Sequence, residues 1–256
     1  MENAGQKAVA EFVATLALVF VGAGSVIVAS NPPLSGSGLI GVAIAHGLVL
    51  AVMVSVVGHL SGGHVNPAVT VAAWVTGNIR TALAALYVVA QLAGGIAGAL
   101  LLRWVFPADA WRRAALGAPL VNHQAGMTSG KAVVLEAILT FFLVFTVYGT
   151  AVDERGSFSK IAGLPIGLVL TFDILAGGPL TGAAMNPARA FGPELVGGTW
   201  TDWWVYWIGP VGGGVIAAAV YWFSFLGGRE KMVGAPRTEQ PIGGGPEGDR
   251  EPAEGP

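Results

Sequence analysis

Two copies of one short motif are the most distinctive polar feature of this sequence. Each copy follows a run of small residues and precedes an apolar segment. Proline suits the first position of a helix, because the N–H that it lacks would be unpaired there. An asparagine before it can accept a backbone N–H with its side-chain oxygen and so cap the helix. Each motif therefore predicts a short helix, about 15 Å long for about ten residues. The motif residues are Asn66, Pro67, Ala68, Asn186, Pro187 and Ala188.

Two such helix N-termini that meet inside an apolar protein would select neutral polar molecules. Helix N-termini carry partial positive charge, which repels cations. While each asparagine oxygen caps its helix, the side-chain NH₂ can still donate to a passing water. A water that accepts from both asparagines turns its hydrogens away, which interrupts the hydrogen-bonded chain that protons need. One copy of the motif could be an ordinary helix cap, but two copies in equivalent places favour the functional interpretation.

Composition indicates that these motifs lie in a membrane. The chain is 54% hydrophobic and only 11% charged, against about 25% charged in soluble proteins. Six apolar runs approach the roughly 20 residues that cross about 30 Å of hydrocarbon, although the fifth is short. The first run reads as a retained helix and not as a cleaved signal peptide. We predict an all-α membrane protein with six transmembrane helices, within residues 8–29, 39–57, 81–105, 132–152, 161–176 and 203–226.

Charge and residue usage indicate orientation and location. The side that holds both termini has eight Lys and Arg residues and the other side has four, with Arg189 counted on neither. The excess of positive charge predicts cytoplasmic termini. The Ala-, Gly- and Val-rich usage favours a prokaryotic plasma membrane over a vacuolar membrane.

Several classes of function are disfavoured. A net charge of −2 argues against nucleic acid as a partner. The chain has no cysteine, so it has no disulfide, thiol nucleophile or thiolate metal site. No nucleophile–base pair, metal-spaced cluster or phosphate-binding loop is recognisable, so we expect neither an enzyme nor a cofactor or metal.

The chain also contains an internal repeat. The segment AEFVATLALVFVGAG resembles LEAILTFFLVFTVYG with Glu11 matching Glu136, and Asn186 follows Asn66 by 120 residues. Each half has three spans, an odd number, so the second half enters the membrane from the opposite side. The two motifs then begin re-entrant half-helices near the midplane, after non-helical loops expected at 59–64 and 177–183. The predicted organisation is a short cytoplasmic N-terminus (1–7), a channel domain (8–226, with repeats at about 8–105 and 130–226) and a disordered cytoplasmic tail (227–256).

The paired motifs, the repeat and the six spans resemble the aquaporins, the major intrinsic protein family, over about residues 9–226. This resemblance implies one pore per chain, lined by six tilted helices and two half-helices, in a homotetramer embedded in lipid. It implies that Glu11 and Glu136 accept N–H groups of the re-entrant loops. It also implies pore-lining backbone at Gly62, Gly63, His64, Gly182 and Ala184.

Family spacing places the selectivity filter at four residues. One of them, Arg189, is an intramembrane arginine, which is costly and therefore functional by default. The set resembles the filter of plant tonoplast intrinsic proteins, as do the segments GHLSGGHVNPAVT and DILAGGPLTGAAMNPARAFGP. It implies a passive water channel with ammonia as a second solute. The expected filter residues are His46, Ile174, Ala183 and Arg189.

The sequence leaves three alternatives open. A glycerol or small-solute facilitator is disfavoured by Ala190 and by Tyr206 and Trp207, which are water-channel residues, although Glu194 departs from the small residue usual in water channels. A proton-coupled transporter would suit the buried acids and the inverted repeat. A non-conducting junction protein would need a flat apolar face, which the polar third loop does not offer. No filter role is assigned to His123 in that loop.

Overall fold

The computed structural model describes residues 3–32, 34 and 37–227, and every regular element within these ranges is helical. Six of the helices are long and apolar enough to cross a membrane. Helices suit the hydrocarbon interior of a membrane because each backbone N–H and C=O is satisfied within the helix itself. They are α1 (Ala4–Ala29), α2 (Gly38–Ser61), α4 (Thr81–Val105), α6 (Ser129–Val147, continued by a π-helical turn, Tyr148–Val152), α7 (Gly163–Thr181) and α9 (Val205–Phe225).

Two shorter helices begin at the paired motifs. They are α3 (Pro67–Val75) and α8 (Pro187–Gly197), each about half the length needed to span a bilayer. The third loop holds a further short helix, α5 (Ala108–Arg113), and 3-10 turns at Ala115–Gly117 and His123–Ala125. The sequence did not predict these last elements. A final 3-10 turn, Ser159–Ile161, precedes α7.

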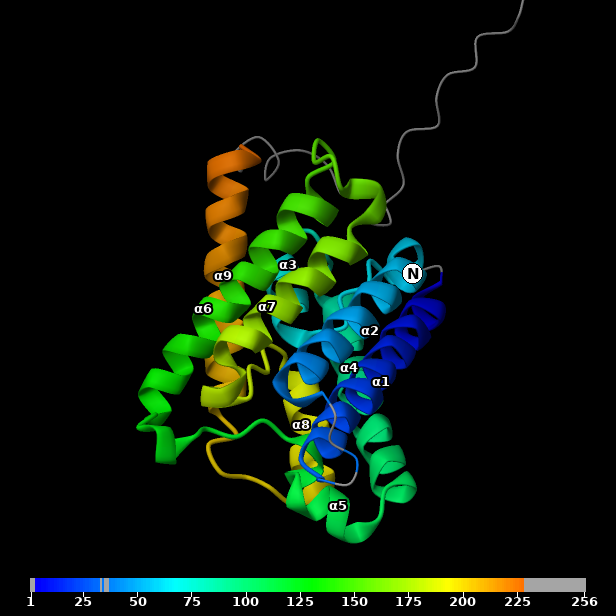
Figure 1. Ribbon diagram of the computed structural model, residues 1–256. Coiled ribbons are helices and arrows are strands. Elements are labelled where there is room, and N and C mark those ends of the chain that lie inside the picture. Colours follow the sequence, from blue (N-terminus) through cyan, green and yellow to red (C-terminus); the bar gives the residue numbers. More distant parts are fainter. Residues whose placement is uncertain (1–2, 33, 35–36, 228–256) are drawn as a thin grey trace, which may run out of the picture.

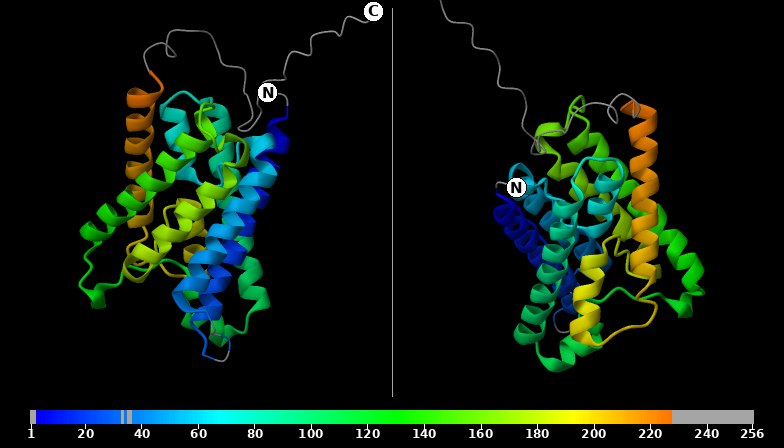
Figure 2. Two further views of the ribbon diagram at one scale, coloured as in Figure 1. Left: turned by 45° about the horizontal axis from the view of Figure 1, so that its top comes forward. Right: turned by 180° about the vertical axis from the view of Figure 1, so that it is seen from behind.

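The two halves of the chain exchange their half-helices. Helices α1 and α4 pack together in the first half, α6 and α9 pack together in the second, and α2 packs against α7 between the halves. Half-helix α3 packs on α9, whereas α8 packs on α4. The start of α1 and the end of α9 lie on one face, here called the terminal face, and α5 lies on the opposite, outer face (Figures 1 and 2). This exchange places the first residues of α3 and α8 in the middle of the molecule.

Glycine allows α8 to approach α4 closely. A Cβ atom at Gly95 would lie 2.5 Å from the backbone oxygen of Ala188, a distance that real Cβ atoms do not reach. Because Ala188 belongs to the second motif, this contact fixes the depth of that motif against the wall of the first half.

Several predicted boundaries were wrong. Helix α1 begins at Ala4, within the segment expected to precede it. Helix α2 continues to Ser61 and α7 continues to Thr181, so the non-helical loops shrink to residues 62–66 and 182–186. The apolar runs stop at Val57 and Ala176, but the backbone stays helical beyond them, through Pro179 in the last turn of α7, which leaves one carbonyl without its helical N–H. Of the predicted tail, only Gly227 falls among the described residues.

Candidate pore and selectivity filter

Each motif asparagine caps its half-helix. Oδ1 of Asn66 accepts from the backbone N–H of Ala68 at 2.8 Å. Oδ1 of Asn186 accepts from the N–H groups of Ala188 at 3.0 Å and Arg189 at 3.2 Å. The prolines that follow both asparagines are the first helical residues. Both caps therefore use the oxygen and leave the side-chain NH₂ available.

The two asparagines also bind across the repeat. Nδ2 of Asn66 donates to the carbonyl of Met185 at 2.8 Å, and Nδ2 of Asn186 donates to the carbonyl of Val65 at 2.9 Å. An amide NH₂ has two hydrogens, so each asparagine keeps one hydrogen without a partner among the described residues. Both side chains line the central cavity. No local sequence signal predicts these crossed bonds, because they exist only once the two loops meet.

Both loops before the motifs adopt the same strained backbone. Three residues in each loop have positive φ, at positions 120 apart in the chain. Left-handed backbone costs a residue other than glycine about 1–3 kcal/mol, so surrounding contacts must hold it in place. The residues and their φ values are Gly62 (92°), Gly63 (61°), Val65 (54°), Gly182 (82°), Ala183 (45°) and Met185 (50°).

Glu11 holds the first loop. Its Oε1 accepts from the Ser61 hydroxyl at 2.7 Å and the His64 N–H at 2.9 Å. Its Oε2 accepts from the Val65 N–H at 2.6 Å and from Nε2 of Gln91 at 2.8 Å. The carboxylate is fully buried and does not line the cavity. Four donors on one buried carboxylate make it a clamp for the loop.

Glu136 holds the second loop in the same way. Its Oε1 accepts from the Thr181 hydroxyl at 2.7 Å and the Ala184 N–H at 3.0 Å, and Oε2 accepts from the Met185 N–H at 2.8 Å. It is also fully buried and outside the cavity lining. The two glutamates therefore occupy equivalent places in the repeat.

A pair of tyrosines that the sequence did not predict supports the same loops. The Tyr87 hydroxyl donates to the carbonyl of Ser61 at 2.7 Å, and the Tyr206 hydroxyl donates to the carbonyl of Thr181 at 2.8 Å. The aligned repeats YVVAQL and YWIGPV contained the signal, since both begin with one of these tyrosines. Each pore loop is thus held by one glutamate and one tyrosine.

Arg189 and His46 meet at one end of the cavity. The Nη1 atom of Arg189 donates to the carbonyl of Gly117 at 2.9 Å, and Nη2 lies 3.2 Å from Nε2 of His46. Nδ1 of His46 lies 2.9 Å from the Val42 carbonyl. An arginine only donates, so Nε2 accepts and the histidine carries its proton on Nδ1. The anchoring role of Gly117 was not predicted.

The other two expected filter residues are buried to the same degree as His46 and Arg189 but do not line the cavity. Ile174 is 3% exposed and Ala183 is 1% exposed, and neither lines the cavity, whereas His46 and Arg189 do. Among the expected backbone positions, Gly182 is outside the lining. The remaining positions, Gly62, Gly63, His64 and Ala184, line it.

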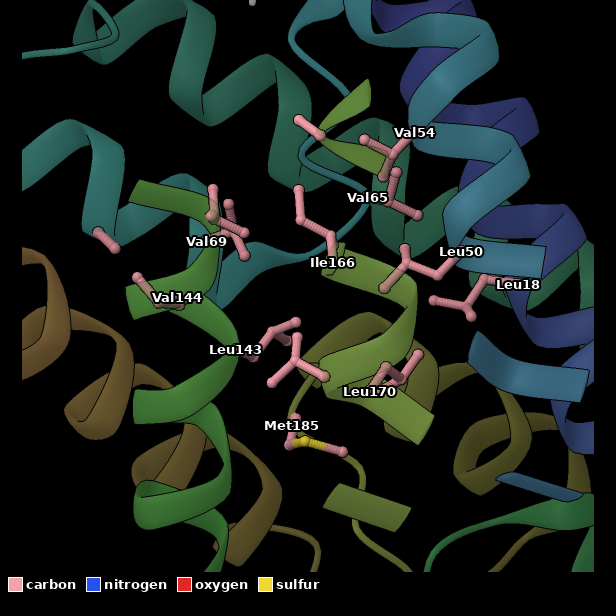
Figure 3. Packing of buried hydrophobic residues seen from close by; sticks show 14 of the residues in the cluster. Leu18, Leu50, Val54, Val65, Val69, Leu143, Val144, Ile166, Leu170 and Met185 are labelled. Atoms are coloured by element: carbon pink, nitrogen blue, oxygen red, sulfur yellow. The ribbon is translucent and has the colours of Figure 1, made fainter. Parts of the chain in front are cut away.

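The cavity has a volume of about 1130 Å³ and extends from the terminal face past both asparagines to His46 and Arg189. One wall is polar and carries the pore loops. The facing wall is apolar, and Figure 3 shows side chains from α2, α6 and α7 that face a common space. Beside the two asparagines, a molecule in the cavity therefore finds its hydrogen-bond partners on the side of the pore loops. The apolar lining residues include Leu18, Leu50, Val54, Val69, Leu143, Val147, Ile166 and Leu170.

An ion pair braces the terminal mouth of the cavity. Nε and Nη2 of Arg155 donate to the carboxylate of Asp153 at 2.8 and 2.7 Å, and Nη2 also donates to the carbonyl of Phe225 at 2.8 Å. The hydrogen bonds from Arg155 lower the pKa of Asp153 to about 2. The pair therefore stays ionised at neutral pH and connects the loop before α7 to the last turn of α9.

Gly22 on α1 makes room for the filter histidine. A Cβ atom there would lie 2.6 Å from Cδ2 and Nε2 of His46. We predict that Gly22→Ala pushes the imidazole toward the pore and lowers solute flux severalfold, measured in proteoliposomes. Gly212→Ala is the control, because no atom lies within 4 Å of a Cβ at Gly212. Equal flux in the two variants would contradict the prediction.

These features define a multi-pass membrane protein with inverted repeats and two half-helices that meet in a central cavity. The model of the Major intrinsic protein family matches residues 2–221. Aquaporin TIP1-2 of Zea mays is 48% identical over 232 residues, 89% of this chain and 89% of that protein. Aquaporin TIP2-1 of Arabidopsis thaliana is 43% identical over 228 residues, 87% and 88% of the two chains. The chain belongs to the major intrinsic protein family, the aquaporins.

A solved structure shows the same fold. The X-ray structure of the aquaglyceroporin from Plasmodium falciparum has a TM-score of 0.75 and covers 85% of this chain and 95% of that chain. Its sequence identity is 24%, so the likeness concerns the fold alone and says nothing of the solute.

Proposed function

We propose that this protein is a passive water channel that follows osmotic gradients and excludes protons and other ions. The observation that carries the proposal is the pair of crossed asparagines, each with one N–H left toward the cavity between two helix N-termini. A water there accepts from both donors and points its hydrogens away, so protons find no continuous hydrogen-bonded chain. Cations meet the positive helix ends and then Arg189.

The buried acids argue against a proton-coupled transporter. Glu11 and Glu136 are saturated with donors from their own loops and do not line the cavity. A proton relay would need at least one acid in contact with the solute path. We expect flux that is indifferent to a pH gradient across the vesicle membrane. Uptake that accelerates with an imposed proton gradient would favour the transporter instead.

Solute choice is tested by comparing water, ammonia and glycerol in the same proteoliposomes. The neutral, accepting Nε2 of His46 beside Arg189 suits small molecules that both donate and accept hydrogen bonds, which supports water and ammonia. We expect water flux and ammonia-driven internal alkalinisation well above empty vesicles, with little glycerol entry. Glycerol entry as fast as water flow would favour the facilitator.

Mercury provides a chemical test of the filter. The native chain has no cysteine, so we predict that mercuric chloride leaves water permeability unchanged. Ala184→Cys places a thiol in the cavity lining and should make the channel sensitive to mercury, with recovery after a reducing agent. A strong reversible block of the native protein would contradict this pore assignment.

We further propose a homotetramer embedded in lipid, with one pore per chain and both termini cytoplasmic. The six spans expose many large apolar side chains, which suits contact with lipid or with other copies of the chain. The plant TIP-type relatives favour a vacuolar membrane, whereas the residue usage favours a prokaryotic plasma membrane. Membrane fractionation of the native cells decides between these locations, and cross-linking in the membrane measures the number of copies.

A further inference from the structure

A hydrogen-bonded cluster on the outer face joins the third loop to the loop before α9. Nε2 of His123 lies 2.7 Å from Oδ2 of Asp202, and Nδ1 lies 2.8 Å from the carbonyl of Met127. Oδ1 of Asp202 accepts from the Ser129 hydroxyl at 2.7 Å. The His123 side chain is 52% exposed, so it exchanges protons freely with the outer solution.

The geometry of this cluster requires a protonated histidine. Both ring nitrogens of His123 face oxygen acceptors, one a carbonyl and the other a carboxylate. A neutral imidazole has one N–H and one lone pair, so it would leave a lone pair against an acceptor. Only the imidazolium donates to both.

The same loop reaches the filter. Asn122, next to His123, donates from its backbone N–H to the Leu180 carbonyl at 2.9 Å and from Nδ2 to the Pro179 carbonyl at 3.0 Å. A few residues earlier, the carbonyl of Gly117 accepts from Arg189 at 2.9 Å. A short stretch of chain therefore separates the His123 cluster from the group that anchors the filter arginine.

Strained backbone surrounds that anchor. Ala115, Leu116 and Gly117 all have positive φ, at 47°, 54° and 76°. Such backbone persists only where neighbouring contacts hold it. The side chain of Leu116, on the N-terminal side of the anchor, is fully buried in a cluster with Ala23 and Ile27 of α1. On the other side the loop is held through Asn122 and His123.

We propose that His123 is a positioning residue for the filter: its protonated ring clasps the third loop to Asp202 and so keeps the Gly117 carbonyl where it holds the Arg189 guanidinium against the pore wall. This inference rests on the proposed water-channel function. The contact between His123 and Asp202 is here called the clasp. When the ring loses its proton the clasp loosens, the Arg189 guanidinium moves into the pore and water flux falls.

The neighbouring charges set the direction of the pH dependence. The elements around this loop carry the titratable groups Asp202, Lys131 on α6, Tyr206 on α9 and Glu194 on α8. Among these described residues, Asp202 is the one whose charge acts on His123. The hydrogen bond to Asp202 raises the pKa of His123 above its ordinary value of 6.5. The clasp is therefore complete at acidic pH and is lost as pH rises through this raised pKa.

The test is water permeability of full-length protein in liposomes as a function of a pH kept equal on both sides. We expect wild-type permeability to fall about twofold to fivefold from acidic to alkaline pH, the range that an exposed charged pair imposes on an equilibrium. His123→Gln should give a flat profile. Asp202→Asn should move the midpoint to lower pH. His59→Gln, an exposed histidine on the last turn of α2, should keep the wild-type profile.

Proton titration of His123 in the purified protein, followed by NMR with the His123→Gln variant as assignment, tests the clasp without any flux. A midpoint above 6.5 that falls in Asp202→Asn supports the clasp, whereas a midpoint at or below 6.5 overturns it. A pH-independent wild-type permeability, or a pH dependence retained in His123→Gln, also overturns the clasp and leaves the channel intact. Wild-type permeability equal to that of empty liposomes at every pH instead overturns the channel, and the titration then decides the clasp alone.

Discussion

Replacing Arg189 with alanine should raise cation leakage through the pore by at least about tenfold. A unit charge about 4 Å from the path of a cation adds up to about 4 kcal/mol to the energy barrier that the cation meets, at an effective dielectric constant of 20. Arg189 is 3% exposed and lines the end of the cavity. Its removal takes away a fixed positive charge where no bulk water screens it. Water flux should persist, because the two capping asparagines that line the cavity are unchanged.

The measurement is potassium flux into proteoliposomes at fixed voltage, together with water flux in the same preparation. Arg113→Ala is the matched control, because Arg113 is an exposed arginine at the end of α5. The control should match the native protein in both fluxes. Potassium flux unchanged in Arg189→Ala would mean that the helix ends alone exclude cations and that this arginine has another role.

Removing the Glu136 carboxylate should destabilise the fold more than most single substitutions. Glu136→Ala leaves three donors, from Thr181, Ala184 and Met185, without their acceptor in a buried loop. Each orphaned buried donor costs about 1–3 kcal/mol, so we expect a loss of about 3 kcal/mol or more. The strained backbone at Ala183 and Met185 would then relax, and the second half of the pore would lose its shape.

Thermal unfolding in detergent, followed by tryptophan fluorescence, measures this loss. Asp109→Ala, at an exposed acid on α5, is the control and should change stability little. Glu11→Ala should lower the melting temperature at least as much as Glu136→Ala, because Glu11 accepts from four donors. A melting temperature for Glu136→Ala close to that of the control would show that the loop does not depend on this acid.

The fold was predictable from the sequence because the membrane restricts the possible structures. It was sufficient that each half has an odd number of apolar runs of spanning length and one copy of the paired motif. These features predicted six helices and two half-helices, and the family match agrees with that prediction. The ends of α2 and α7 were not predictable. The apolar runs stop at Val57 and Ala176, whereas the helices continue to Ser61 and Thr181.

The candidate site was predictable where a residue acts through its own chemistry. Asn66 and Asn186 as caps, and Arg189 as an intramembrane cation, could be identified from residue type and position. The crossed bonds to Val65 and Met185 could not, because they join segments more than a hundred residues apart. The Gly117 carbonyl was equally invisible, since any residue supplies a carbonyl and only the fold of the third loop aims it at Arg189.

The most direct test of the proposed function is the shrinkage rate of liposomes containing the purified protein after an osmotic step, recorded by stopped-flow light scattering against empty liposomes. We predict shrinkage much faster than in empty liposomes, with an activation energy close to that of water diffusing in bulk. Shrinkage no faster than in empty liposomes, at both acidic and alkaline pH, would contradict the assignment of this cavity as a water pore.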